Sequence, residues 1–193
     1  MLKIKSAEAV NLLLKQQMHP HFLFNSLHTI KILYKDNPEL GEEYLVYLAD
    51  FLRTTITETH SVTATVDEEI NLLENYLKMQ KMRFDNALQW EIINDEIDLT
   101  RIVLPALSLQ PLAENAIKHN YFSQKNPLLI IIEIKNGFLK ISNNISKKKY
   151  ADYSVGTGLM NISERYYMWC GEDLEILDDG NFFIVNLKLK KIE

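Results

Sequence analysis

The spacing of apolar residues changes near residue 85, from a helical period to a strand period. Before this point, apolar residues recur at steps of three and four, which predicts amphipathic helices. These helices are expected at 6–35, 39–60 and 67–84. After it, β-branched and alternating runs predict strands at 88–93, 128–134, 138–142 and 182–189, with helices at 105–120 and 158–170. The order predicts an α+β protein: a helical module, then an α/β sandwich in which helices cover one face of a mostly antiparallel sheet.

Two turn signals refine this prediction. Pro38 disfavours the helical conformation for Asn37, so the first two helices should form an antiparallel hairpin. Two helices bury little apolar surface alone, and the hairpin is therefore expected to dimerise into a four-helix bundle. Asn136-Gly137 lies between two strand patterns and predicts a β-hairpin.

Composition limits the classes of function. The chain has 21 Lys and Arg against 26 Asp and Glu, a formal net charge of −5, and no basic block. This balance argues against a protein that grips nucleic acid. Cys170 is the single cysteine, so no internal disulfide can form, which favours a cytosolic setting. No stretch of the sequence approaches the roughly 18 apolar residues of a membrane span.

The first candidate site is His21, which follows Pro20 inside a helical pattern. A proline in a helix interior costs about 3 kcal/mol and bends the helix. A neutral imidazole nitrogen is a competent nucleophile, and the ordinary histidine pKa of about 6.5 leaves most of it neutral at pH 7. The alternative reading is a histidine that merely decorates a helix surface.

The second and third candidates are a helix with a polar edge and a Gly-x-Gly turn. Asn115 could offer an amide oxygen to Mg²⁺, and Lys118 and His119 could approach phosphate oxygens. Gly156 and Gly158 precede an amphipathic helix, whose backbone N–H groups could meet a phosphate. Taken singly, the first pattern is also typical of the polar edge of an ordinary helix, and the second is also typical of a turn that opens a helix.

Together these segments resemble the LytS/YehU-type sensor histidine kinases, which join a phosphoacceptor module to a GHKL, or Bergerat, ATP-binding domain. Residues 20–25 (PHFLFN) are similar to the phosphoacceptor signature of that family, and residues 110–119 to its N-box. Residues 156–159 (GTGL) with Asn161 and Arg165 resemble its second glycine box, and Glu68, Glu69 and Ile70 its linking helix. The resemblance implies a phosphoacceptor and dimerisation module at 1–65, a linking helix at 66–84 and an ATP-binding domain at 85–193.

The resemblance also implies roles for individual residues. His21 would accept the γ-phosphoryl group of ATP, and Asn115 would hold Mg²⁺. Asn143 would accept a hydrogen bond from the adenine amino group, where the family usually has aspartate. The remaining nucleotide-binding residues would be Lys118, His119, Gly156, Thr157, Gly158 and Leu159. Pro111 stands where related ATPases carry a water-activating glutamate, which favours phosphoryl transfer over hydrolysis.

The same resemblance implies a homodimer that passes its phosphoryl group to an aspartate of a response regulator of the LytTR type. It places the chain on the cytoplasmic side of the membrane, below an upstream membrane sensor region. Two alternatives stay open. Asn143 and Ile145 depart from the first glycine box of the family, so the chain could be a degenerate nucleotide-binding or dimerisation scaffold without kinase activity. A purely structural module would bind no nucleotide.

Overall fold

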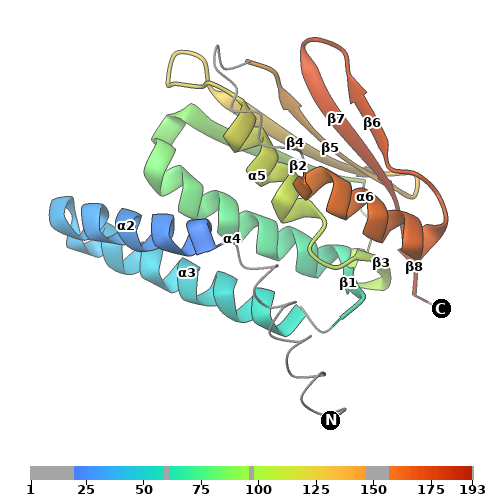
Figure 1. Cartoon of the computed structure of the whole chain (residues 1–193), viewed down its shortest axis with the longest axis horizontal. Coiled ribbons are helices and arrows are strands. Elements are labelled where there is room, and N and C mark those ends of the chain that lie inside the picture. The colour runs from blue at the N-terminus through green and yellow to red at the C-terminus, as the bar shows by residue number, and fades with distance from the viewer. Residues whose placement is uncertain (1–19, 59–60, 96–97, 147–156, 193) are drawn as a thin grey trace. The chain divides into compact units, whose positions relative to one another are not determined.

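The computed structural model describes residues 20–58, 61–95, 98–146 and 157–192 (Figure 1). The chain divides into two compact units, Met1–Ser61 and Val62–Glu193. The helix expected at 66–84 belongs to the second unit, and its separate role as a linking helix stays a prediction. The two units are described in turn.

The first unit contains the predicted helical hairpin. α2 (Pro20–Asp36) and α3 (Pro38–Glu58) are separated by Asn37 alone. The Asn37 side-chain oxygen accepts a hydrogen bond from the Leu40 backbone N–H (3.3 Å), which caps α3. Pro38 opens α3, a position that lacks a helical hydrogen bond in any case. The hairpin is therefore confirmed, while residues 6–19 and 59–60 of the two expected helices lie outside the described residues.

Close packing holds the two helices together. A Cβ atom at Gly41 would lie only 2.9 Å from the Cα atom of Tyr34, so only glycine fits at this crossing. The Phe22 and Phe51 rings pack with their centroids 5.2 Å apart. Several large apolar side chains of the hairpin nevertheless stay exposed, namely Phe24, Leu27, Ile32, Leu45 and Val46. The hairpin thus leaves an apolar surface uncovered.

The second unit is built on a five-stranded sheet with the order β2-β4-β5-β7-β6. Its strands are β2 (Leu88–Asn94), β4 (Leu128–Lys135), β5 (Phe138–Asn144), β6 (Glu175–Asp178) and β7 (Phe182–Lys188). Only β2 and β4 pair in parallel, and the other neighbours are antiparallel. The helices α4 (Val66–Phe84), α5 (Leu109–His119) and α6 (Thr157–Cys170) lie on one side of this sheet (Figure 1). The predicted α+β architecture with a mostly antiparallel sheet is confirmed.

Burial alternates along the central strand β4, although its sequence is apolar almost throughout. Along β4, alternate residues are buried, and they are Leu128, Ile130, Ile132 and Ile134. α5 faces this surface with a buried apolar stripe of Leu109, Leu112, Ala113 and Ala116. Asn136 and Gly137 both have positive φ (53° and 80°), as a type I′ turn requires, so the predicted hairpin is confirmed as β4–β5.

A small second sheet was not predicted. It has the order β1-β3-β8, from β1 (Thr63–Thr65), β3 (Ile102–Pro105) and β8 (Lys190–Lys191). Short 3₁₀ turns occupy η1 (Asp85–Ala87) and η2 (Leu99–Arg101). The expected start of a helix at residue 105 is wrong, because Pro105 ends β3 and α5 begins only at Leu109. Strands of two to four residues are too short to show an alternation that would reveal them.

Candidate functional site

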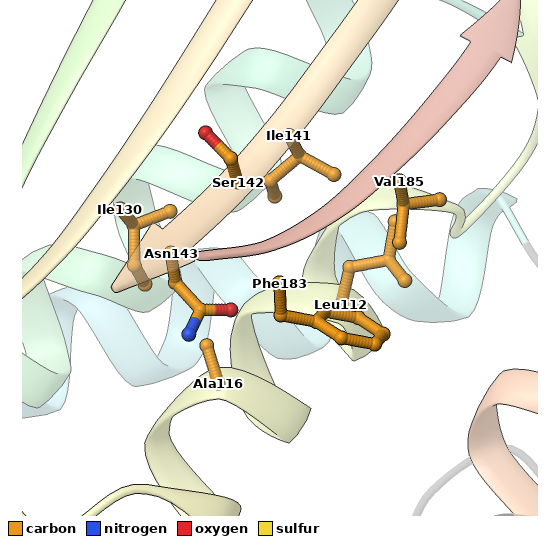
Figure 2. A pocket seen from close by; sticks show the side chains of 8 residues that line it. All are labelled: Leu112, Ala116, Ile130, Ile141, Ser142, Asn143, Phe183 and Val185. Atoms are coloured by element: carbon orange, nitrogen blue, oxygen red, sulfur yellow. The ribbon is translucent and has the colours of Figure 1, made fainter. Parts of the chain in front are cut away.

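A pocket opens between α5 and the central strands β4, β5 and β7 (Figure 2). It is lined by Leu112, Ala116, Ile130, Ile141, Ser142, Asn143, Phe183 and Val185. Most of these side chains are apolar, and the carboxamide of Asn143 is a polar group among them. Its lining is thus apolar with a small number of polar groups, a composition that small-molecule sites share.

The orientation of Asn143 is set by its neighbour. Its amide nitrogen donates a hydrogen bond to the backbone carbonyl of Asn144 (2.8 Å), and the residue is 5% exposed. Figure 2 shows the carboxamide oxygen on the side that faces Phe183. The pocket therefore presents a hydrogen-bond acceptor that a ligand with an N–H group could reach.

The side chains of two further asparagines form hydrogen bonds around the end of β5. The side chain of Asn144 accepts from the Leu129 N–H (2.8 Å) and donates to the Pro127 carbonyl (3.0 Å). Buried Asn120 donates to the Ala116 carbonyl (2.9 Å) and accepts from the Ser146 N–H (2.7 Å). Asn120 thus ties the end of α5 to the chain beyond β5. Sequence reasoning missed this residue, because nothing local distinguishes it from an asparagine that simply ends a helix.

The polar edge of α5 meets the first turn of α6. A Cβ atom at Gly158 would lie 3.7 Å from the Asn115 carboxamide oxygen and 3.8 Å from its nitrogen. Asn115 is half-buried, and Lys118 and His119 are exposed near the end of the same helix. Two motifs that are far apart in the sequence, the polar edge and the Gly-x-Gly turn, are therefore neighbours in the structure.

The other predicted site residues have different places. Leu159 is half-buried in the first turn of α6, which Thr157 opens. Gly156 and the side chain of Thr157 lie outside the described residues. His21 lies in the first turn described for α2, in the unit Met1–Ser61, and its side chain is also outside them. The structure thus brings together Asn115 and Gly158, beside a pocket that holds Asn143.

Comparison with known proteins adds an independent observation. The histidine kinase family matches residues 11–88. Sensor histidine kinase BtsS of Escherichia coli K12 is 32% identical over 168 residues, which are 85% of this chain and 30% of that protein. Sensor protein kinase HptS of Staphylococcus aureus USA300 is 37% identical over 106 residues, 55% of this chain and 20% of that protein.

The chain belongs to the LytS-type family of sensor histidine kinases. The resemblance predicted from its motifs is thereby confirmed. The chain spans less than a third of the length of the curated relatives it matches. In the described parts of residues 20–192, no helix has both the length and the apolar character needed to cross a membrane.

Two solved histidine kinases align with this chain at low sequence identity. Acinetobacter baumannii histidine kinase AdeS aligns with a TM-score of 0.44 and 14% identity over 97% of this chain and 94% of that one. The catalytic domain of histidine kinase ThkA aligns with a TM-score of 0.44 and 14% identity, covering 65% of this chain and 93% of that one.

Proposed function

We propose that this chain is the kinase core of its sensor, which binds Mg-ATP and transfers the γ-phosphoryl group to His21. The observation that carries the proposal is the apolar pocket between α5 and the sheet, with the Asn143 acceptor in its wall. Adenine is a weakly polar ring with one amino group, and an apolar lining that contains one amide acceptor complements both properties. The membership in the histidine kinase family supports the same assignment.

The residues beside the pocket fit the triphosphate and its metal ion. Mg²⁺ in nucleotide sites is held by one or two protein oxygens and by the phosphates themselves, so the Asn115 oxygen would suffice as the ligand from this helix. Lys118 and His119, at the exposed end of α5, would approach phosphate oxygens. The first turn of α6, with Gly158 and Leu159, would offer backbone N–H groups. Bound Mg²⁺ would neutralise part of the phosphate charge.

The proposed transfer needs positioning more than acid–base chemistry. A nitrogen of the neutral His21 imidazole would attack the γ-phosphorus of ATP and form a P–N bond. The bond from that phosphorus to the β,γ-bridging oxygen would break, ADP would leave with the electron pair, and the imidazole would lose its ring proton to solvent. The product is phosphohistidine, from which a response-regulator aspartate would take the group.

Phosphoryl transfer is favoured over ATP hydrolysis by the residues at the start of α5. Pro111 has no group that could activate water. The nearest acid on this helix, Glu114, accepts a hydrogen bond from the Gln110 side chain (3.1 Å). The helix thus offers no carboxylate at the position where related ATPases use one.

The wider biological setting concerns the dimer, the partner and the place of the chain in the cell. The exposed apolar residues of the hairpin, such as Leu27 and Leu45, support a homodimer formed through a four-helix bundle. Partnership with a response regulator, of the LytTR type, and a position on the cytoplasmic side of a membrane below an upstream sensor follow from the family alone.

The proposal is tested by incubating the chain with γ-labelled Mg-ATP. Acid-labile, base-stable label on a folded, dimeric sample is expected, since phosphohistidine has this stability. A sample that binds nucleotide without taking up label would instead support the scaffold alternative. Asn143 and Ile145 motivate this alternative, and the neutral amide of Asn143 makes a weaker bond to adenine than a carboxylate does. A sample that does neither would leave a structural module.

Replacing Asn143 by leucine is expected to remove the preference for the adenine amino group. Leucine keeps the approximate volume of the side chain but offers no acceptor, and a lost buried hydrogen bond costs about 1–3 kcal/mol. The wild-type chain should bind ATP more tightly than purine riboside triphosphate, which lacks the amine, and Asn143→Leu should bind the two equally. Calorimetric titration of both nucleotides measures this, and a variant that retains the preference would contradict the assignment.

Replacing Gly158 by alanine is expected to separate stability from nucleotide binding. The added methyl group would be in ordinary contact with Asn115 at 3.7 Å, so the fold tolerates it, and alanine should stabilise the helix by about 0.4–1 kcal/mol. The same methyl group would fill the space between α6 and Asn115 where the phosphates are proposed to lie. Thermal unfolding should occur at a slightly higher temperature while Mg-ATP affinity falls, and unchanged affinity would show that the phosphates bind elsewhere.

A further inference from the structure

The first turn of α5 is held by a buried carboxylate from another helix. Glu69 of α4 is 1% exposed. One of its oxygens accepts the Leu107 N–H (2.5 Å), and the other accepts the N–H groups of Ser108 and Leu109 (2.9 Å each). These three donors lie at the start of α5, where backbone N–H groups lack partners within the helix. Glu69 therefore caps α5 from outside that helix.

An arginine from α6 holds the same turn by its carbonyl groups. The guanidinium of Arg165 donates to the backbone carbonyls of Ala106 and Leu107 (2.9 Å each). The N–H and the C=O of Leu107 are thus bonded to two opposite charges, from α4 and from α6. Leu107 has φ = 58°, a conformation that costs energy for any residue other than glycine and persists only where its surroundings fix it.

The two charges depend on each other. Burial raises the pKa of Glu69, while its backbone donors and the charge of Arg165 act in the opposite direction. Burial likewise lowers the pKa of Arg165, and the charge of Glu69 counters this. Removal of Arg165 would leave the Glu69 carboxylate as a buried charge without this compensation, which is strongly unfavourable.

We propose that Glu69 and Arg165 are positioning residues of the nucleotide site, which fix α5 and α6 relative to α4 and thereby set the spacing between Asn115 and Gly158. The inference rests on the proposed function. Both helices that this pair joins carry proposed nucleotide-binding residues, Asn115 on α5 and Gly158 on α6. α4 follows the His21 module in the chain. The pair therefore also joins the helix next in sequence to that module to the two helices of the proposed site. Neither side chain lines the pocket itself.

The test compares Glu69→Gln with Glu68→Gln, the same chemical change on the adjacent exposed residue of α4. Glu68 forms a capping box with Thr65, which glutamine can also complete. Glutamine offers one acceptor oxygen and an NH₂ group that cannot accept, so at least one of the three bonds is lost at position 69. ATP affinity is measured with Mg²⁺ and with EDTA, below the unfolding temperature of each variant. Glu69→Gln should lose about tenfold or more in Mg-ATP affinity and much less in EDTA, because misplacement of Asn115 acts through the metal ion. Glu68→Gln should match the wild type in both.

The outcomes separate this inference from the proposed function. A folded Glu69→Gln variant with wild-type Mg-ATP affinity, or with equal losses with and without Mg²⁺, would overturn the positioning role. A wild-type chain that binds no ATP would remove the proposed function and this inference with it. If Glu69→Gln does not fold, the double variant Glu69→Gln/Arg165→Met replaces it, since it leaves no unpaired buried charge. The same loss of Mg²⁺ dependence supports the role there, and retention overturns it.

An exchange experiment on the wild type covers the case in which neither variant folds. Backbone amides at 107–109 should exchange more slowly with deuterium when Mg-ATP is bound, if the turn they form is coupled to the nucleotide site. Equal exchange rates with and without Mg-ATP would overturn the proposal.

Discussion

Replacement of His21 by glutamine is expected to reduce labelling by γ-labelled Mg-ATP to background while leaving nucleotide affinity unchanged. The glutamine amide has no nucleophilic nitrogen, so the proposed P–N bond cannot form. Nucleotide affinity should be unaffected because His21 belongs to the unit Met1–Ser61, whereas Asn115, Asn143 and Gly158 all belong to Val62–Glu193. Label retained on the protein after acid and base treatment, together with an ATP titration of the same sample, measures both effects.

His28 provides the matched control for this substitution. It lies exposed on the same helix, α2, so His28→Gln makes the same chemical change without touching the proposed acceptor. This control should label as the wild type does. Full labelling of His21→Gln would show that the phosphoryl group goes to another residue, and equal loss in both variants would indicate damage to the hairpin.

Replacement of Asn115 by alanine is expected to weaken Mg²⁺-dependent ATP binding by at least about 10–100-fold, with a parallel loss of label. Alanine removes the amide oxygen proposed as the metal ligand, and the phosphates lose the charge neutralisation that the metal ion supplies. Affinity for ATP in EDTA should change little, because Asn115 does not line the pocket proposed for adenine. Titration of ATP with and without Mg²⁺ distinguishes the two contributions.

Asn71 offers the corresponding control for Asn115. It is an exposed asparagine of α4 whose side chain donates to Asp67 (3.0 Å), and Asn71→Ala should leave both affinities unchanged. If Asn115→Ala retains both Mg-ATP affinity and labelling, the metal ligand is not Asn115. A lower unfolding temperature in Asn115→Ala would not by itself explain a loss confined to the Mg²⁺ titration.

Local sequence signals determined the elements of this fold. Asn37-Pro38 ends one helix and begins the next because proline restricts the residue before it and is tolerated in a first turn. Asn136-Gly137 forms the β4–β5 turn because both residues accept a positive φ at low cost. The β-branched run at 128–134 indicated a strand, and the order of three motifs indicated the family. Each of these signals acts between residues close together in the chain.

Only the tertiary structure decided which distant residues meet. The approach of Gly158 to Asn115, the acceptor of Asn143 in its pocket and the two charges on Leu107 all join segments far apart in the sequence. The short strands β1, β3 and β8 likewise exist because they pair with one another rather than through their own preferences. The late start of α5 has the same origin, since Glu69 and Arg165 hold residues 106–109 in a turn. Backbone preference is a property of near neighbours, whereas pairing and burial are set by the packing of the whole unit, and no short stretch of sequence records them.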